Sequence, residues 1–275
     1  MILVVGDVVD DIGVRPLGRV NAASDTEAEI RMTAGGSAAN VAAWLAHLGV
    51  PVRFVGRAGV DGVARHVAAL PGVDARIGAD PTQPTATIVL TLDEHADRTM
   101  YVDRGANGTL SRDDLSDEIW DGITWLHLTG YTFFDPATRP VAQWLASEAA
   151  ARGLGVSIDP SSLGFLEAAG RDRVLDWFGP ADLWFPNEDE QRFLRIEGAA
   201  VVETLGPAGA RFGATVVPAA PADVIDTTGA GDAFCAGFLS VWVAPEPTAE
   251  AALAAGALAA ANCVALRGAR PAPVT

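Results

Sequence analysis

A short stretch near the C-terminus carries residue types suited to binding phosphate. Residues 226–234 read DTTGAGDAF, and the apolar residues that follow recur with a period of about 3.6 residues, which predicts an amphipathic helix from about Asp232. A helix start leaves backbone N–H groups unpaired and carries partial positive charge. The N–H groups of Gly229, Ala230 and Gly231, here called the glycine nest, are therefore candidates for holding an anion.

Asp232 comes directly after the glycine nest and is the candidate general base for an attacking hydroxyl. The helix dipole is expected to keep this carboxylate ionised. A weak base of this kind suits a loose phosphoryl-transfer transition state, in which the nucleophile loses its proton late. The alternative is an ordinary glycine-rich turn in which Asp232 only caps the helix.

Composition limits the classes of protein to consider. The chain has 275 residues, of which 49% are hydrophobic and 20% charged, as expected for one large α/β domain spanning 1–275. We find no apolar run of about 18 residues and no basic region before the first apolar run, so we expect neither a membrane span nor a signal peptide, and a cytoplasmic location. The net charge of −16 argues against a nucleic-acid or anionic-membrane partner.

All 19 basic residues are arginine. The absence of lysine excludes a Walker A loop, a protein-kinase catalytic lysine and a pyridoxal Schiff base. Cys235 and Cys263 lie in predicted helices without metal-ligand spacing, so we interpret both as reduced core residues, and the four histidines are likewise scattered.

The elements that must position this site alternate along the chain. Ile2 to Val5 is a short apolar run that predicts a buried parallel strand ending at Gly6 and Asp7, with Asp10 and Asp11 just beyond. Further strands are expected at 125–128, 156–159 and 183–185, and helices at 138–151 and 248–266, the last stopped by Gly268. This order predicts a mainly parallel sheet with helices on both faces.

Residues 14–33 and 85–102 depart from that pattern. From Thr85 to Leu92 polar and apolar residues alternate, a polar turn at 93–97 follows, and Met100 to Val102 continue the alternation, so a β-hairpin is predicted.

Gly35 and Gly36 precede a predicted helix that Gly49 ends. The two glycines allow close approach of a ligand, and Asn40 would point its amide over the start of that helix.

Together these segments resemble the ribokinase-like (PfkB) carbohydrate kinases, from residue 2 to about 270 and in the order of that family's motifs. The run 226–234 is similar to the C-terminal signature, 35–40 to the G-G-x-x-x-N motif, 187–190 to N-x-x-E, and 204–209 to T-L-G-x-x-G. The resemblance implies a ribokinase-like three-layer α/β sandwich in which 14–33 and 85–102 form a small β lid over the sugar, and it allows a homodimer through that lid; the alternative is a plain edge hairpin.

The resemblance also assigns residues to ligands. For the acceptor it implies Asp11, Gly35, Gly36, Asn40, Tyr101 and Arg104; for the nucleotide it implies Asn187, Thr204, Gly206, Gly209, Thr228 and Asn262. Asn187 and Glu190 would hold Mg²⁺ through water, although this pair could also be only a helix cap. Two departures stand out: Val9 replaces an Asn usual in ribokinases, and only about ten residues separate the N-x-x-E and T-L-G-x-x-G segments, which predicts a shortened or lost helix.

The predicted function is an ATP-dependent kinase acting on a hydroxyl of a sugar or sugar-like molecule, with Mg²⁺ and with a monovalent cation as a further candidate cofactor. Arg98 and Arg104, where the lid meets the sugar, would suit an acidic sugar such as 2-keto-3-deoxygluconate, unless they are only surface arginines on a hairpin. An adenosine-type nucleoside kinase of the same fold, or a non-catalytic sugar- or nucleotide-binding protein, stays open as an alternative.

Overall fold

The computed structural model describes residues 1–92, 98–179, 181–197 and 200–272. Its larger sheet has nine strands in the order β13-β12-β11-β10-β9-β8-β1-β4-β5, parallel except at the β11–β12 and β12–β13 pairs. These strands are β1 Ile2–Val5, β4 Val52–Gly59, β5 Asp74–Asp80, β8 Trp125–Thr129, β9 Gly155–Asp159, β10 Leu183–Trp184, β11 Ala200–Thr204, β12 Ala210–Phe212 and β13 Thr215–Val217. The predicted mainly parallel sheet is confirmed.

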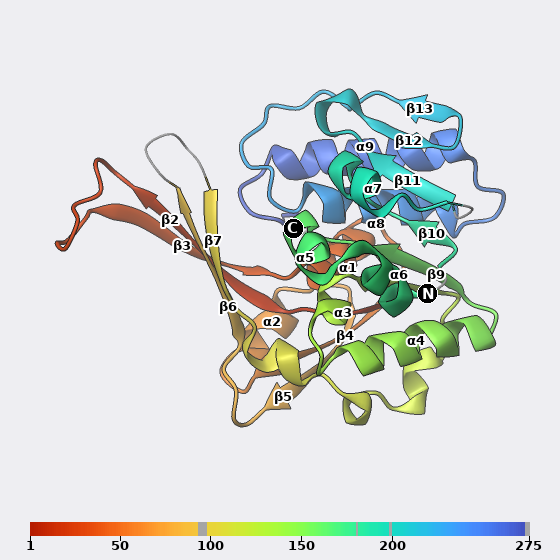
Figure 1. Cartoon of the computed structure of the whole chain (residues 1–275), viewed down its shortest axis with the longest axis horizontal. Helices are drawn as coiled ribbons and strands as arrows, with labels where there is room; N and C mark the ends of the chain where they lie inside the picture. The colour runs from red at the N-terminus through yellow and green to blue at the C-terminus, as the bar shows by residue number, and fades with distance from the viewer. Residues whose placement is uncertain (93–97, 180, 198–199, 273–275) are drawn as a thin grey trace.

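Helices cover both faces of this sheet (Figure 1). Successive side chains of a strand point to opposite faces, so Ile2 and Val4 join one buried cluster while Leu3 and Val5 join the other. The first cluster includes α1 Ser37–His47, α8 Ala230–Trp242 and α9 Ala249–Val264. The second includes α4 Arg139–Ala151, α5 Leu163–Ala169, α6 Arg171–Phe178 and α7 Glu188–Leu194. The three-layer sandwich follows from these two cores.

The smaller elements connect these layers. They are the helices α2 Val63–Ala68 and α3 Tyr131–Phe134 and the 3₁₀ turns η1 Gly105–Thr109, η2 Arg112–Asp114, η3 Asp117–Trp120 and η4 Gly206–Ala208. Between β10 and β11 the described residues hold one short helix, α7, as the short spacing there predicts. None of the helices in the described ranges is long and apolar enough to cross a membrane.

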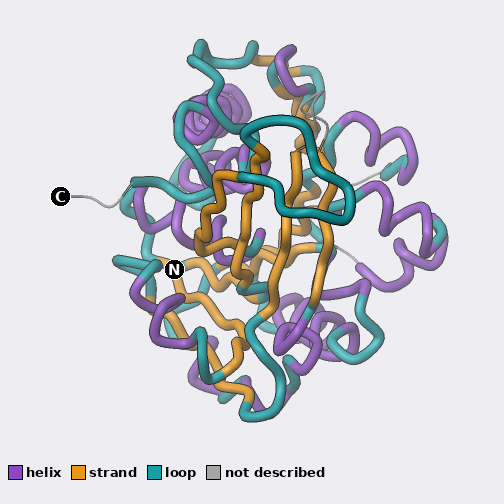
Figure 2. The backbone as a smooth tube through the Cα atoms, turned by 90° about the vertical axis from the view of Figure 1, so that its left-hand side faces the viewer, coloured by secondary structure: helices purple, strands orange, loops and turns teal. Residues whose placement is uncertain are grey.

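The second sheet is a lid that projects from the body in Figure 1 and faces the viewer in Figure 2. Its strands are β2 Val9–Pro16, β3 Ala28–Gly35, β6 Ala86–Leu92 and β7 Arg98–Asp103, in the order β3-β2-β6-β7. Both predicted lid segments contribute strands to this sheet, and β6 pairs with β7 antiparallel as the predicted hairpin requires. The first lid strand begins earlier than predicted, at Val9, and the predicted turn at 93–97 lies outside the described residues.

Two helix boundaries differ from the sequence-based expectation. Helix α8 begins at Ala230 rather than near Asp232, because Gly229 takes a left-handed conformation (φ 77°) and serves as its N-cap. Helix α9 is capped by Thr248 as predicted but ends at Val264 rather than at Leu266. Asp232 is therefore the third residue of α8 and lies within its first turn.

Candidate active site

A cavity of about 1010 Å³ lies between the lid and the carboxyl ends of the parallel strands. Asp7 lines it just after the end of β1, and Asp11 lines it from β2. Tyr131 lines it from the start of α3, and the glycine nest and Asp232 line it from the start of α8. Open parallel sheets bind their ligands at this edge, at the point where the connections from two neighbouring strands run to opposite faces of the sheet. The cavity is therefore the candidate active site.

Asp232 is held in the cavity wall by two donors from α1. The Ser37 hydroxyl donates to Oδ1 over 2.6 Å, and the Asn40 amide donates from Nδ2 to Oδ2 over 2.9 Å. Residues three apart on a helix share a face, which explains why both donors reach the same carboxylate. Only 9% of Asp232 is exposed to solvent. Its carboxylate is thus fixed in place before any substrate arrives.

The ionisation of Asp232 differs from the expectation. Burial raises the pKa of Asp232 to about 7, the hydrogen bonds from Ser37 and Asn40 oppose this rise, and the charges of Asp7 and Asp11 add to it. The prediction of a weak base kept ionised by the helix dipole is wrong, because loss of hydration and two neighbouring carboxylates outweigh the dipole. A base with a pKa near neutrality is better matched to proton transfer at physiological pH.

The glycine nest has the geometry of an anion site. Among the described residues, the backbone N–H groups of Gly229 and Gly231 have no hydrogen-bond acceptor, and the first regular helical bond runs from Ala233 to the Gly229 carbonyl. A Cβ on Gly229 would lie 2.4 Å from the Cβ of Ala269, so only glycine fits there. Thr228 instead turns its N–H and hydroxyl to Asp226, at 3.0 and 2.7 Å, and shapes the turn that leads into the nest.

The end of the cavity around Asp11, predicted for the acceptor, depends on close backbone packing. A Cβ on Gly35 would lie 1.8 Å from the Asp11 carboxylate, and one on Gly36 would lie 2.4 Å from the Asp7 carbonyl. Asp7 accepts the N–H groups of Ser37 and Ala38 and thereby anchors the start of α1. Burial raises the pKa of Asp11 to about 6, and Asp7 raises it further while Arg270 lowers it. Asp11, Gly36 and Asn40 all line the cavity.

Of the two described lid residues that we predicted to contact substrate, one lines the cavity and the other does not. Arg104 lines the cavity, but its guanidinium already donates to the Tyr131 carbonyl over 2.8 Å and lies 3.7 Å from the Asp135 carboxylate. Tyr101 is 61% exposed and is not brought to the cavity, since its neighbours Met100 and Val102 line it and alternate residues face opposite sides. The Arg98 side chain lies outside the described part of the chain.

Of the residues predicted for the nucleotide, Thr228 lines the cavity, and the other five lie outside its lining. The side chains of Asn187 and Glu190 cap each other's backbone N–H at the start of α7, at 2.9 and 3.0 Å. Thr204 pairs with Asn187 and leads into the η4 turn, which contains Gly206 and ends at Gly209. Asn262 lies exposed on α9. The structure therefore joins Asn187 to Thr204 but leaves Asn262 without a contact to either.

The carboxylates near this group fit a cation held through water. Burial raises the pKa of Glu190, and it raises the pKa of Asp159 well above its usual range, with the charges of Glu190 and Asp232 adding to the rise for Asp159. A divalent cation would relieve this repulsion. No group of three His, Cys, Asp or Glu residues in the described ranges could ligate a metal directly. Mg²⁺, which retains several waters in most sites, is consistent with that arrangement.

Both cysteines are buried and free, as predicted. Cys235 lies with its thiol 3.8 Å from the Asp159 carboxylate, and burial raises the pKa of this thiol well above its usual range. Burial also raises the pKa of Cys263 to about 12. Neither thiol is therefore ionised at neutral pH.

Sequence reasoning missed three residues of this site. Ser37 could have been found, because it lies three residues before Asn40 on the same helix face. Asp159 ends a predicted strand but carries no motif. Arg270, which contacts Asn40 and Gly35, is one of 19 arginines and follows no recognisable spacing.

Comparisons with known proteins agree with this geometry. The profile of the pfkB family carbohydrate kinases matches residues 1–274. A Klebsiella pneumoniae fructokinase is 33% identical, with 88% of each chain covered, and an ATP-dependent ribose-1-phosphate kinase of Halopiger xanaduensis is 31% identical, covering 91% of this chain and 88% of its own. A candidate ribokinase II from E. coli, solved with ATP and Mg²⁺, superimposes with a TM-score of 0.82 at 22% identity, covering 98% of this chain and 94% of its own.

Proposed function

We propose that this chain, which belongs to the pfkB family of carbohydrate kinases, moves the γ-phosphoryl group of ATP to a sugar hydroxyl, usually a primary alcohol, with Asp232 as general base. One observation carries the assignment of the base: its carboxylate is buried in the cavity wall, fixed by Ser37 and Asn40, with a pKa raised to about 7. A helix cap needs neither this burial nor two donors from another helix.

The residues of the cavity divide the chemistry between them. Asp11 and the backbone of Gly36 bind acceptor hydroxyls and orient one of them toward Asp232, which takes its proton as the new bond to phosphorus forms. The free N–H groups of Gly229 and Gly231 stabilise the charge that develops on the transferring phosphoryl oxygens. The lid limits access of water, which would otherwise compete as acceptor.

The nucleotide and its metal would lie beside the cavity. Asn187 and Glu190 are the residues proposed to hold Mg²⁺ through water, and Thr204, Gly206, Gly209, Thr228 and Asn262 are those proposed for ATP. Mg²⁺ supplies charge neutralisation at the phosphate oxygens when bound. A monovalent cation and a cytoplasmic location remain predictions.

The choice of acceptor depends on the lid. Of the two lid arginines predicted for an acidic sugar, Arg104 is the one whose side chain the structure describes, and Arg104→Ala should raise the KM of such a substrate far more than that of ATP. A second candidate, a nucleoside, is favoured by the apolar wall that Ile88, Leu90 and Met100 of the lid and Phe165 of α5 present to the cavity. A flat base would bury its faces against such a wall.

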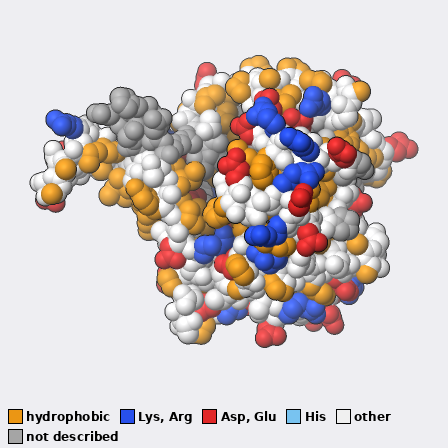
Figure 3. Space-filling model, in the orientation of Figure 1, with side chains coloured by type: hydrophobic (Ala, Val, Ile, Leu, Met, Phe, Trp, Pro, Cys, Tyr) orange, Lys and Arg blue, Asp and Glu red, His pale blue; other side chains and the backbone are white. Residues whose placement is uncertain are grey.

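The lid face that points away from the cavity is the proposed contact surface of a homodimer. Ile30, Met32 and Tyr101 are 66%, 59% and 61% exposed there, and Figure 3 shows hydrophobic side chains gathered on the lid. Exposed apolar patches of this kind mark association surfaces. Sedimentation equilibrium of Tyr101→Arg beside the unmodified protein tests it: an unchanged mass for a dimeric parent would contradict a lid-mediated dimer.

The function is tested by a panel of acceptors with ATP and Mg²⁺, containing fructose, ribose, ribose 1-phosphate, 2-keto-3-deoxygluconate and adenosine. We expect transfer to at least one acceptor and loss of that transfer in Asp232→Asn. Absence of transfer with measurable binding of sugar or nucleotide would instead favour the non-catalytic alternative. Transfer that persists in Asp232→Asn would remove Asp232 as the base.

A further inference from the structure

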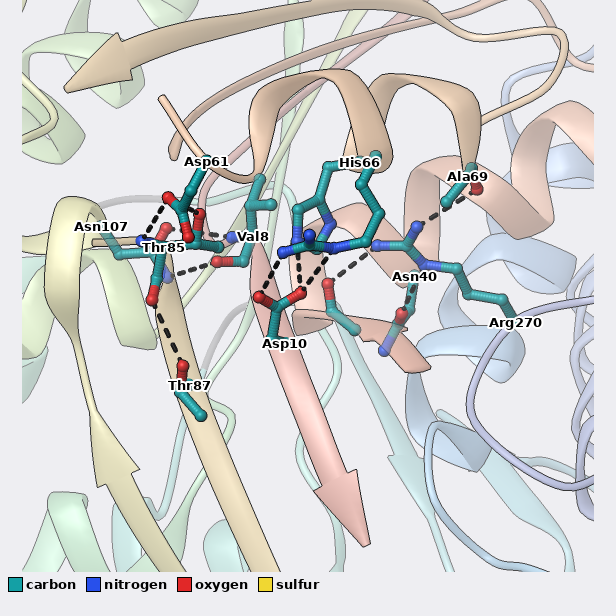
Figure 4. Close-up of polar contacts among 12 residues, drawn as sticks. Val8, Asp10, Asn40, Asp61, His66, Ala69, Thr85, Thr87, Asn107 and Arg270 are labelled. Atoms are coloured by element: carbon teal, nitrogen blue, oxygen red, sulfur yellow. Dashed lines mark hydrogen bonds and ion pairs between the residues drawn. The ribbon is translucent and has the colours of Figure 1, made fainter. Parts of the chain in front are cut away.

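Arg270 extends from the segment after α9 into the space between α1, α2 and the lid. Its Nε donates to the Asn40 side-chain carbonyl over 3.1 Å, its Nη1 to the Ala69 carbonyl over 3.2 Å, and its Nη2 to the Gly35 carbonyl over 2.8 Å. Figure 4 shows the guanidinium pointing toward both Asn40 and Ala69. One side chain thus joins three segments that meet at the acceptor end of the cavity.

We propose that Arg270 is a positioning residue for phosphoryl transfer. It fixes the Asn40 amide so that this amide holds the Asp232 carboxylate, and its positive charge favours the ionised form of that carboxylate. The proposal rests on the proposed function of Asp232.

The orientation of the Asn40 amide follows from the chemistry of its two neighbours. A guanidinium can only donate hydrogen bonds and an ionised carboxylate can only accept them. The amide oxygen must therefore face Arg270 and the amide nitrogen must face Asp232, as observed. Among the described residues Arg270 is the donor to the Asn40 amide oxygen, so its removal would leave that oxygen without this hydrogen bond and the amide less firmly held in the orientation that binds the carboxylate.

The charge of Arg270 is the second part of the argument. Its three acceptors are uncharged, and within the described residues it forms no ion pair, which is costly for a partly buried cation. Burial lowers the pKa of Arg270 to about 10, whereas the charges of Asp11, Asp7 and Asp232 raise it. By reciprocity this cation favours the ionised forms of those carboxylates. The cost of burying this cation is offset because its charge reduces the repulsion among the three carboxylates.

Other ionisable groups also face this part of the molecule, so the effect of Arg270 has to be separated from theirs. Those that interact with Asp232 or with Arg270 are Asp7, Asp11, His66, Tyr131, Asp159, Cys235 and Cys263, and Asp10, Glu190 and Asp226 act on members of this set. Burial lowers the pKa of His66, so Arg270 is the cation of this group. Its removal should therefore shift the Asp232 pKa upward.

The anchoring of Arg270 explains why it can serve as a rigid reference. Ala69 is the C-cap of α2, and the same helix carries Arg65 and His66, which hold Asp10 at the base of the lid at 2.5 and 3.1 Å. Figure 4 shows this second cluster beside the first. The guanidinium is thereby fixed between the base of the lid and Asn40.

Two substitutions separate orientation from charge. In Arg270→Gln the side-chain amide nitrogen can take the place of Nε and still donate to Asn40. The Met side chain of Arg270→Met has about the same length as that of Gln but carries no hydrogen-bond donor. We expect Arg270→Met to lower kcat at pH 7 by about 10–100-fold, with the KM for ATP within about twofold, and to move the acid limb of the kcat/KM profile up by about one pH unit. Arg270→Gln should show the same shift but recover most of kcat at high pH.

The controls distinguish positioning from a structural role. Arg173 is an exposed arginine, and Arg173→Met should match the unmodified protein in every measurement. A structural role would affect Gln and Met variants alike, lower their melting temperatures and leave the acid limb in place. That result, or unchanged kcat and pH profile in Arg270→Met, would overturn the proposal. If Arg270→Met does not fold, the pH shift of Arg270→Gln decides.

A measurement without turnover keeps this test independent of the proposed function. Carbon-13 NMR of the Asp232 carboxyl in the free protein, assigned by its absence in Asp232→Asn, gives its titration directly. The Asp232 pKa should rise by about one unit in Arg270→Gln. This rise in a protein without kinase activity would contradict the proposed function but keep the electrostatic link, and an unchanged pKa in an active enzyme would overturn the link alone.

Discussion

The proposed acceptor side and the proposed nucleotide side of this site differ in how far the protein arranges them without ligands. On the acceptor side, Asp232 is buried between two donors and glycines let backbone and carboxylates approach closely. On the nucleotide side, Asn187 and Glu190 satisfy each other in a helix cap and Asn262 lies exposed. The proposed base is thus held in place before a substrate binds, whereas the exposed amide of Asn262 would form its contact with ATP only on binding.

This difference predicts how each side responds to substitution. Preorganised groups act where charge develops, so their loss should lower kcat. Exposed groups that become ordered only on binding contribute a smaller net amount, because ordering offsets part of each contact. Changes on the acceptor side should therefore affect turnover, and changes on the nucleotide side should affect apparent affinities.

The largest effect is expected for Asp232→Asn. Asn is nearly the same size, but it cannot take the proton, and loss of a general base costs about 10²–10⁴ in rate. The deficit should appear in kcat, with ATP affinity within a few-fold, in steady-state kinetics on the best acceptor. A variant with intact thermal unfolding that keeps a tenth or more of kcat, where phosphoryl transfer limits the rate, would show that the base lies elsewhere.

The pH dependence should reveal the same side of the site. Asp232 accepts a proton only when ionised, and burial raises its pKa to about 7. Below that pH, kcat/KM should fall about tenfold per unit, and more steeply once Asp11, whose pKa burial raises to about 6, also becomes protonated. Initial rates from pH 5 to 9 check this. A flat profile down to pH 5 would mean that neither carboxylate titrates in this range during catalysis.

The next effect concerns Glu190→Gln on the nucleotide side. Gln retains an oxygen that can accept the Asn187 N–H, so the cap and the fold should persist. Loss of the charge should raise the Mg²⁺ concentration for half-maximal rate by about tenfold, the range seen when an outer ligand of a metal is lost. Glu188→Gln, two residues earlier in the same helix and exposed, is the matched control. Superimposable Mg²⁺ titrations would restrict Glu190 to capping α7.

The smallest effect is expected for Asn262→Ala. Its exposed amide can offer ATP one hydrogen bond, so KM for ATP should rise about two- to tenfold with kcat unchanged. Isothermal titration with ATP gives the same quantity as a Kd. A loss of kcat as large as that of Asp232→Asn would reverse the contrast between the two sides.

Much of the fold was predictable because its signals are local. β1 was predicted residue for residue, since a fully buried run has clear ends, and the hairpin of β6 and β7 followed from alternation, whereas the lid as a whole was implied by the family resemblance. Alternation could not say which face of β7 meets the cavity, so Tyr101 was assigned to the substrate although the structure turns it away. The pKa of Asp232 and the contacts of Arg270 depend on segments far apart in sequence, which no local pattern reports.

The two buried cysteines make the protein suitable for labelling at a chosen position. Their thiols are protonated at neutral pH, so maleimides should react slowly with the unmodified chain. A cysteine placed at Met32, which is 59% exposed on the outer face of the lid, would then be the preferred site of attachment. A fluorophore there would test whether the lid moves during turnover, without removal of any native residue from the core.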